Sequence, residues 1–399
     1  MKKARKRSVA ELESRTRADG TNHAMVSIAG GGPAGLVAGL TVARHGGRAV
    51  VFERNAEVGK RFHGDFQGLE NWTAEGDVLD ELAGIGVEPS FDAAPYREGV
   101  IFGPDGREYG CRSPRPLFYL VRRGPEPGTL DSALRDQALR AGVEIRFGEP
   151  RDHLPEGGIV AHGPRGADVI AVGYVFETDM ADGCFGAFSD RLAPGGYSYL
   201  LVHRGRGAVA ACLFGRFHEE KEFRDRTVAF FHEKAGLRMT TSRPFGGEGN
   251  FTLPSTARQG KLLFTGEAAG FQDALWGFGM RYAMASGHMA ALALLDGNPE
   301  RYDALWQARL GGLIRSSLVN RYLFDKAPDS AYGLVLRRLG RDTDAREWLC
   351  RLYMPRVWKS LSYPIAQRAI RSRRRAATCA KEGCDCTWCR CRHEPPAHH

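Results

Sequence analysis

Apolar and polar positions near the start of the chain follow two different periods. Residues Met25 to Ala29 form a short apolar run that predicts a buried strand, and residues 48–53 predict a second strand. Between them, apolar residues recur at helical spacing over 33–45, and Gly46-Gly47 ends this pattern. Strand, helix and strand in this order predict the βαβ unit of a parallel sheet.

The turn between the first strand and the helix carries the pattern G-x-G-x-x-G. Gly30 allows a tight turn, Gly32 lets the backbone approach a pyrophosphate, and Gly35 lets helix and strand touch. Glu53 follows 21 residues after Gly32, where a carboxylate can accept hydrogen bonds from a ribose. The helix N-terminus offers unpaired N–H groups to the phosphates. The dinucleotide site predicted from these features comprises Gly30, Gly32, Pro33, Ala34, Gly35, Glu53 and Arg54.

A second strand–turn–helix pattern lies far downstream. Residues 262–265 predict a strand that runs into the sequence Gly266-Glu267-Ala268-Ala269-Gly270. After a short loop, Gly277-Phe278-Gly279-Met280 opens a helical pattern that ends at about Leu295. Small residues are frequent along this helix, and we expect them to let it pack closely against the first helix.

The rest of the chain divides into a β-rich part and a helical part. Two-residue alternation over 169–178 and 208–214 predicts sheet, whereas 301–375 follows helical patterns. The predicted organisation is a disordered basic arm (1–24), a discontinuous dinucleotide-binding domain (25–165 and 250–300), a β-rich substrate domain (166–249), a helical region (301–375) and a cysteine-rich tail (376–399).

Residues 264–270 and 277–283 together resemble the second FAD motif of the geranylgeranyl reductase family, which is similar to FixC-like and para-hydroxybenzoate-hydroxylase-like flavoproteins. The family usually has Asp where this chain has Glu267. The resemblance implies a mixed α/β fold, in which a Rossmann-type FAD-binding domain is interleaved with a β-rich substrate domain and C-terminal helices cap the substrate pocket. The FAD contacts that it implies are Gly266, Glu267, Gly279 and Met280.

A stretch between the two motifs also resembles the family. Residues 119–123, followed by 129–134, are similar to the family's arginine-and-aspartate stretch that leads into a helix. The inserted segment Gly124-Pro125-Glu126-Pro127-Gly128 leaves two arginines to choose from. Of these we assign Arg122 to FAD.

A second stretch resembles the family's P-x-x-Y-x-W-x-F-P substrate motif. Residues 193–202 carry this resemblance, which implies that Tyr197 and Tyr199 line the substrate pocket. A plain strand with aromatic residues packed on it is the alternative interpretation. His63, in the segment after the second strand, is a further candidate for the pocket, although a loop histidine is more often simply solvated.

The resemblance implies an FAD-dependent oxidoreductase that reduces a C=C bond of an isoprenoid or another apolar substrate. A flavin-dependent monooxygenase (hydroxylase) is the close alternative, because one fold hosts several reactions. An electron-transfer flavoprotein dehydrogenase and a non-catalytic FAD-binding scaffold are further alternatives. The sequence has no second dinucleotide fingerprint, so an external reductant such as NAD(P)H, ferredoxin or a quinol has to bind without a Rossmann site of its own. The flavin carries the chemistry, and no catalytic side chain is assigned.

The net charge of +9 is concentrated at the two ends. Residues 1–23 carry +4 and residues 356–375 carry +7 with no acid, which leaves 24–355 at −2. A nearly neutral body argues against a nucleic-acid partner. The C-terminal run mixes apolar residues with cations, as an interfacial helix does, so the basic ends are candidate sites of peripheral membrane contact. A solvated basic helix is the alternative.

Cysteines gather at the C-terminus. Thiolates at this spacing can surround Zn²⁺ or another thiophilic metal, and the alternative is a disordered tail of reactive thiols. The start of the chain does not resemble a secretory signal, and no run approaches the about 20 apolar residues of a membrane span. We therefore expect a reduced, cytoplasmic environment. The candidate metal ligands are Cys384, Cys386, Cys389 and Cys391.

Overall fold

The computed structural model describes residues 25–164, 166–327, 329–340, 344–376 and 387–388. The predicted basic arm and the four candidate metal ligands of the tail lie outside these residues. Among the residues that are described, no helix combines the length and the apolar character needed to cross a membrane.

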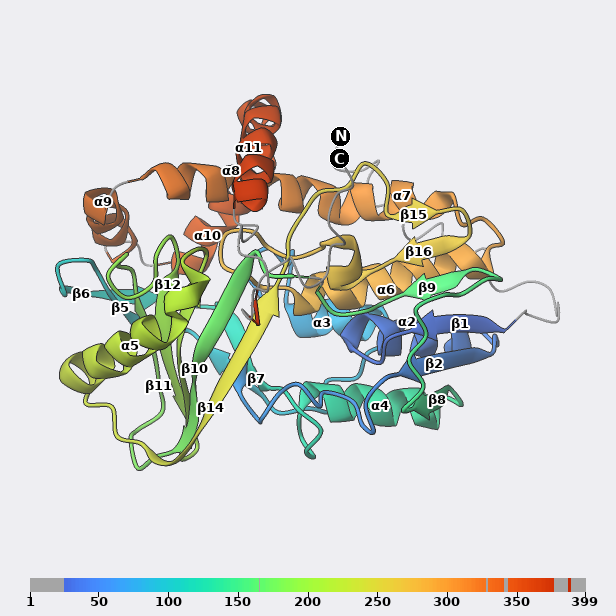
Figure 1. The fold of residues 1–399 in the computed structure, drawn as a ribbon, viewed down its shortest axis with the longest axis horizontal. Helices are drawn as coiled ribbons and strands as arrows, with labels where there is room; N and C mark the ends of the chain where they lie inside the picture. The colour runs from blue at the N-terminus through green and yellow to red at the C-terminus, as the bar shows by residue number, and fades with distance from the viewer. Residues whose placement is uncertain (1–24, 165, 328, 341–343, 377–386, 389–399) are drawn as a thin grey trace.

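A six-stranded, mostly parallel sheet forms one half of the molecule (Figure 1). Its strand order is β15-β16-β9-β1-β2-β8, and β1 pairs in parallel with both β2 and β9. Only the β15–β16 pair is antiparallel. The strands are β1 (Val26–Ala29), β2 (Ala49–Glu53), β8 (Glu144–Phe147), β9 (Gly158–Val160), β15 (Arg258–Gln259) and β16 (Leu262–Phe264).

Helix α2 (Pro33–Arg44) lies at the centre of this half and is buried along most of its length. Pro33 occupies its first turn, where a missing N–H costs nothing. It packs against α4 (Leu130–Arg140) and α6 (Met280–Leu295), the helix that follows the second motif. A methyl group at Gly287 of α6 would overlap the backbone carbonyl of Ala34. The predicted close packing of the two helices is therefore confirmed.

A seven-stranded sheet forms the other half, with α5 (Glu220–Ala235) packed on it. Its strand order is β14-β10-β13-β12-β11-β5-β6, and a three-stranded sheet of order β3-β7-β4 lies between the halves. The strands are β5 (Glu98–Phe102), β6 (Glu108–Arg112), β10 (Val169–Glu177), β11 (Gly183–Ala187), β12 (Tyr197–His203), β13 (Arg206–Leu213) and β14 (Thr240–Gly249), with β3 (Phe66–Glu70), β4 (Ala93–Tyr96) and β7 (Phe118–Arg122) in the smaller sheet.

The predicted domain boundary at residue 166 does not separate the two larger sheets. Strands β5 and β6 lie inside the predicted dinucleotide-binding segment, yet they complete the seven-stranded sheet. The reason is the parallel pairing of β5 with β11, in which Val100 lies opposite Phe185. Such a long-range pairing leaves no local pattern in the sequence.

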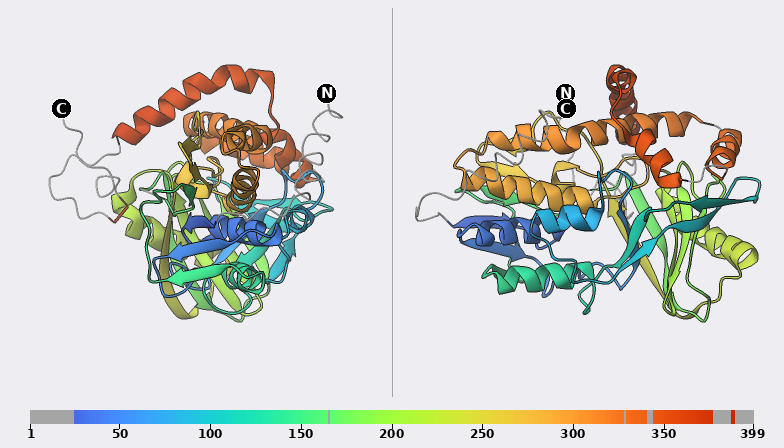
Figure 2. Two further views of the ribbon diagram at one scale, coloured as in Figure 1. Left: turned by 90° about the vertical axis from the view of Figure 1, so that its right-hand side faces the viewer. Right: turned by 180° about the vertical axis from the view of Figure 1, so that it is seen from behind.

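The C-terminal helices form a layer above both halves (Figures 1 and 2). Helix α11 packs on α8 and projects beyond the rest of the layer. This layer also includes a π-helical turn, η4 (Gln307–Gly311), between its first two helices. The helices are α7 (Arg301–Trp306), α8 (Gly312–Lys326), α9 (Asp329–Leu339), α10 (Ala345–Tyr353) and α11 (Val357–Ala376); the remaining short elements are α3 (Val78–Gly84), η2 (Phe217–Glu219) and η3 (Gly266–Ala269).

Substitution of Gly287 tests the contact between α2 and α6. We expect Gly287→Ala to lower the free energy of unfolding by about 1–3 kcal/mol, because the added methyl group overpacks the helix crossing. Gly333 of α9 has open space at the same position, so Gly333→Ala should raise stability by about 0.5–1 kcal/mol. Urea denaturation of the two variants measures both changes, and equal effects would contradict the close packing.

Candidate active site

A large cavity of about 1440 Å³ lies where the two halves and the helical layer meet. Its wall is mostly apolar. One end is formed by the glycine-rich loop after β1 and by the start of α6. The other end is formed by the seven-stranded sheet and by helices α8, α9 and α10. The cavity therefore joins the predicted dinucleotide site to the predicted substrate domain.

Two glycines of the first motif, Gly30 and Gly35, form the tight turn and the close helix contact that their spacing predicts. Gly30 has a φ of +112°, and a methyl group there would overlap the carbonyl of Ala161. A methyl group at Gly35 would overlap the carbonyl of Gly30, so helix and turn are in direct contact. Gly32 is different, because no atom lies within 4 Å of its hypothetical Cβ. Gly32, Pro33 and Ala34 line the cavity and leave open space at the start of α2.

Glu53 lines the cavity at the end of β2, as predicted. Its Oε2 accepts a hydrogen bond of 2.8 Å from the backbone N–H of Gly31, and its Oε1 accepts one of 2.9 Å from that of Asn55. The carboxylate therefore fixes the glycine-rich loop. The side-chain amide of Asn55 donates a third hydrogen bond, of 2.7 Å, to Oε1, so of about four acceptor positions one is left for a ribose. Arg54 follows Glu53 in the same wall.

The residues of the second motif meet the first motif at the cavity. Gly266, Glu267, Gly279 and Met280 all line it. The N–H of Gly266 donates to Ser286 Oγ at 2.9 Å, whereas Gly279 at the start of α6 has no side-chain cap. Glu267 lies 3.3 Å from Arg61, while burial raises the pKa of its carboxyl group. The start of α6 is thus a second helix N-terminus at the cavity, which favours negative charge nearby.

Arg123, rather than the predicted Arg122, faces the cavity. Arg122 ends β7 and pairs with Asp92 at 2.8 Å on the other side of the strand. Arg123 lines the cavity, with its guanidinium 4.1 Å from the centre of the Phe62 ring. It forms two hydrogen bonds of 2.8 Å with the buried Asp131. Because successive residues of an extended chain point to opposite faces, only one of the two arginines can reach the cavity.

Tyr197 and Tyr199 line the cavity from β12, in agreement with the implied substrate pocket. Tyr197 donates its hydroxyl hydrogen to the carbonyl of Trp276 at 2.7 Å. Burial raises the pKa of both phenols well above the usual value. His63 is exposed and does not line the cavity; its backbone N–H donates to Asp65. The predicted pocket role of His63 is therefore not supported by its position.

Much of the apolar wall comes from residues that the sequence analysis did not single out. Phe188, Trp276, Phe324 and Tyr332 make ring contacts with one another, with centroids 4.6–6.4 Å apart. Trp72 contributes an indole whose N–H has no partner among the described residues. These residues come from separate segments, so no local pattern could have identified them as one group.

Three cysteines also line the cavity: Cys111, Cys184 and Cys212. Burial raises the pKa of Cys111 to about 11 and those of Cys184 and Cys212 to about 12. They are therefore protonated thiols, which are poor nucleophiles and poor metal ligands. Within the described part of the chain, no group of three or more His, Cys, Asp or Glu side chains is placed to hold a metal ion.

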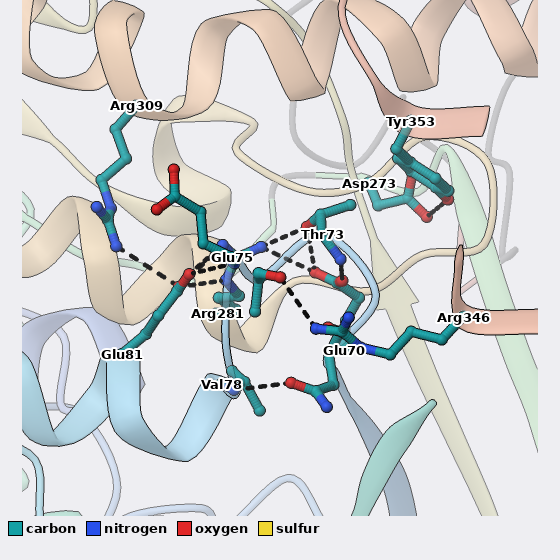
Figure 3. A network of polar contacts seen from close by, with 12 residues as sticks. Glu70, Thr73, Glu75, Val78, Glu81, Asp273, Arg281, Arg309, Arg346 and Tyr353 are labelled. Carbon is teal, nitrogen blue, oxygen red and sulfur yellow. Dashed lines mark hydrogen bonds and ion pairs between the residues drawn. The ribbon is translucent and has the colours of Figure 1, made fainter. Parts of the chain in front are cut away.

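A buried ionic network fixes the first turn of α6 (Figure 3). Arg281 lies between two carboxylates, 3.1 Å from Glu70 of β3 and 2.8 Å from Glu81 of α3. It also donates to Thr73. Arg309 reaches Glu81 from the other side at 3.5 Å and is partly exposed. Because Arg281 directly follows Met280, these contacts hold the end of the helix that faces the cavity.

A second set of contacts fixes the loop between the motif and α6. The carboxylate of Asp273 accepts hydrogen bonds from the N–H groups of Leu275 and Trp276, and from the hydroxyl of Tyr353 at 2.9 Å. Burial raises the pKa of Asp273 to about 6. Arg346, also on α10, donates to carbonyls of the loop after β3 (Figure 3). Helix α10 is thereby fastened over the cavity.

Comparison with known proteins agrees with this architecture. Digeranylgeranylglycerophospholipid reductase 2 of Methanothermobacter thermautotrophicus is 25% identical over 402 residues, which cover 87% of this chain and 98% of that protein. Digeranylgeranylglycerophospholipid reductase of Haloferax volcanii is 24% identical and covers 81% of this chain and 91% of that protein. The chain is a homologue of geranylgeranyl reductases. No protein-family model matches it.

Solved structures show the same fold. A geranylgeranyl bacteriochlorophyll reductase-like protein from Thermoplasma acidophilum matches with a TM-score of 0.66 and 17% identity, over 88% of this chain and all of that one. The flavin-dependent brominase Bmp2 matches with a TM-score of 0.60 and 16% identity, over 89% of this chain and all of that one. The predicted fold and the predicted class, a geranylgeranyl-reductase-like FAD-dependent oxidoreductase, are confirmed.

Removal of the Arg281 side chain tests the ionic network. We expect Arg281→Gln to lower the free energy of unfolding by about 3–5 kcal/mol, because the buried carboxylate of Glu70 loses its ion-pair partner and the half-buried Glu81 is left with Arg309 alone. Arg309→Gln is the matched control. Its partly exposed contact with Glu81 should contribute less than about 1 kcal/mol. Denaturant midpoints report both values, and a small effect at Arg281 would show that the network is dispensable.

The pKa of Asp273 predicts a pH dependence of stability. Its folded pKa of about 6 lies above the usual value of 3.8, so its contribution is fully present below about pH 4 and is lost as pH rises through about 6. The free energy of unfolding of the wild type should therefore exceed that of Asp273→Asn by a larger margin at about pH 5 than at about pH 7.5. Urea unfolding at both pH values measures it. A difference that is independent of pH, or larger at the higher pH, would contradict the assignment.

Proposed function

We propose that the protein binds FAD at the starts of α2 and α6 and uses its reduced form to saturate a C=C bond of an isoprenoid chain in the apolar part of the cavity. The observation that carries this proposal is the continuity of the cavity. One space runs from the open glycine turn at Gly32 to the aromatic wall around Trp276. The relatives named as reductases of geranylgeranyl lipids support the same substrate class.

The residues at the first end fit FAD. The open space at Gly32 and the unused N–H groups at the start of α2 suit a pyrophosphate. Glu53 retains about one acceptor position for the ribose, as its place at the end of β2 requires. At the start of α6, Gly279 and Met280 offer a helix N-terminus beside which a negatively charged reduced flavin is favoured. Arg123 takes the place that the sequence analysis assigned to Arg122.

Side chains of the protein form the apolar end of the cavity and exclude water from it. Bound FAD in its reduced, anionic form would supply the hydride and be reoxidised, and solvent would supply the proton that completes the addition of two hydrogens across the double bond. Aromatic and aliphatic side chains exclude water from the substrate chain. The phenol of Tyr199 and the thiol of Cys212 keep their protons because burial raises their pKa values. These two side chains therefore add no negative charge to the apolar wall.

Anaerobic turnover tests the proposal. Protein loaded with FAD and reduced with dithionite should be reoxidised by a lipid with geranylgeranyl chains in the absence of O₂. Mass spectrometry should find two added hydrogens for each saturated double bond. Reoxidation that requires O₂ and yields a product with an added oxygen would instead indicate a hydroxylase. Failure to bind FAD would contradict the proposal altogether.

Gly32→Ala supplies a variant for the same experiment. The backbone at Gly32 has a φ of −80°, which alanine adopts freely, so folding should be unchanged. The methyl group would fill the space that the pyrophosphate needs, and FAD affinity should fall at least about tenfold. Gly110→Ala, on β6 and outside the cavity, has equally open surroundings and should leave affinity unchanged. Fluorescence titration with FAD compares the two.

A further inference from the structure

The outer face of α11 exposes a line of large apolar side chains. Val357, Leu361 and Ile365 are 78%, 74% and 61% exposed, and they recur at the four-residue spacing of one helix face. Trp358 beside them is 46% exposed. The opposite face of α11 packs on α8 and buries residues such as Ala366. Soluble proteins rarely expose such a contiguous apolar surface without a partner.

The same helix carries positive charge without acidic neighbours. Residues 356–375 contain seven Arg or Lys and no Asp or Glu. Arg356, Arg368 and Arg371 are exposed and make no ion pair with any residue that the structure describes. On α5, by contrast, Arg224 and Arg226 pair with neighbouring carboxylates. The charge of α11 is therefore available to an external anionic partner.

The shape of this surface distinguishes between kinds of partner. Helix α11 projects from the helical layer (Figures 1 and 2). A second copy of the chain seated on the same face would bring two sets of arginines together, and like charges at an interface cost free energy. A terminal segment of the same chain is a further possible partner. Residues 1–23 carry +4 and residues 376–399 carry equal numbers of acidic and basic residues, so neither segment has the net negative charge that would complement α11.

We propose that the outer face of α11 binds the surface of an anionic phospholipid bilayer. An amphipathic helix of this kind lies in the plane of the interface, with its apolar side chains about 5–10 Å into the boundary between headgroups and acyl chains. Val357, Leu361 and Ile365 take that position. Arg368 and Arg371 contact lipid phosphates, and Trp358 lies at headgroup level, where its ring is favoured.

The proposal concerns binding alone and does not depend on the reaction proposed above. It nevertheless suits an enzyme with an apolar substrate. Leu323 of α8 and Val335 of α9 line the cavity and are about half exposed. They belong to the same helical layer as α11 (Figure 1). The proposed bilayer contact and part of the cavity wall therefore lie in one layer of helices.

Vesicle sedimentation of the full-length protein tests the proposal. We expect binding to vesicles that contain phosphatidylglycerol, little binding to pure phosphatidylcholine, and release at high salt. Leu361→Asp combined with Ile365→Asp should weaken binding at least about tenfold. Leu139→Asp combined with Phe147→Asp makes the same change at exposed apolar residues outside α11 and should leave binding intact. Arg368→Glu combined with Arg371→Glu should also weaken it, whereas Lys221→Glu should not.

Light scattering and circular dichroism on the same variants separate the other outcomes. The aspartate variant of α11 should keep the secondary structure and the molar mass of the wild type, because its two side chains are exposed. A fall in molar mass on substitution would mean that α11 joins two copies of the chain, which would overturn the proposal. Equal binding to neutral and anionic vesicles, or no binding to either, would overturn it as well.

Discussion

The contact between α2 and α6 is the constraint on which the rest of the structure depends. The two helices lie far apart in the sequence, and each begins at the large cavity. They approach so closely that Gly287 has no room for a side chain against the backbone of Ala34. Because of this contact, two helix N-termini face one space, and their partial positive charges act on the same ligand. A wider crossing would separate the two halves of the site.

The network of polar contacts around Arg281 also holds α6 in its position relative to α2. It ties α6 to β3 and α3 through two carboxylates, while Asp273 and Tyr353 fix the loop that precedes α6. Buried ion pairs add little net stability by themselves, because desolvation offsets the attraction. Their value here is geometric. They define where Gly279 and Met280 lie relative to the glycine turn after β1, and they attach α10 to the same frame.

The parts of the fold that local patterns determine could be predicted from the sequence. The turn at Gly30 and the helix that begins at Met280 depend on neighbouring residues, so spacing was enough to find them. The choice between Arg122 and Arg123 depends on which face of an extended strand points toward the cavity. Because a segment is inserted directly after the two arginines, the alternation of inward and outward side chains could not be counted from the sequence. The place of β5 and β6, the partners of Arg281 and the aromatic wall depend on contacts between distant segments, which leave no periodic signal.

Together these features describe one site, at which we propose that the sequence motifs bind FAD and that residues from distant segments enclose an apolar substrate. A crystal structure of the protein with bound FAD would test this account most directly. The pyrophosphate should lie at Gly32 and Pro33, and the isoalloxazine ring beside Gly279 and Met280, with its free face toward Tyr199 and Trp276. A flavin ring outside the cavity, or a ring whose path to the aromatic wall is blocked, would contradict it.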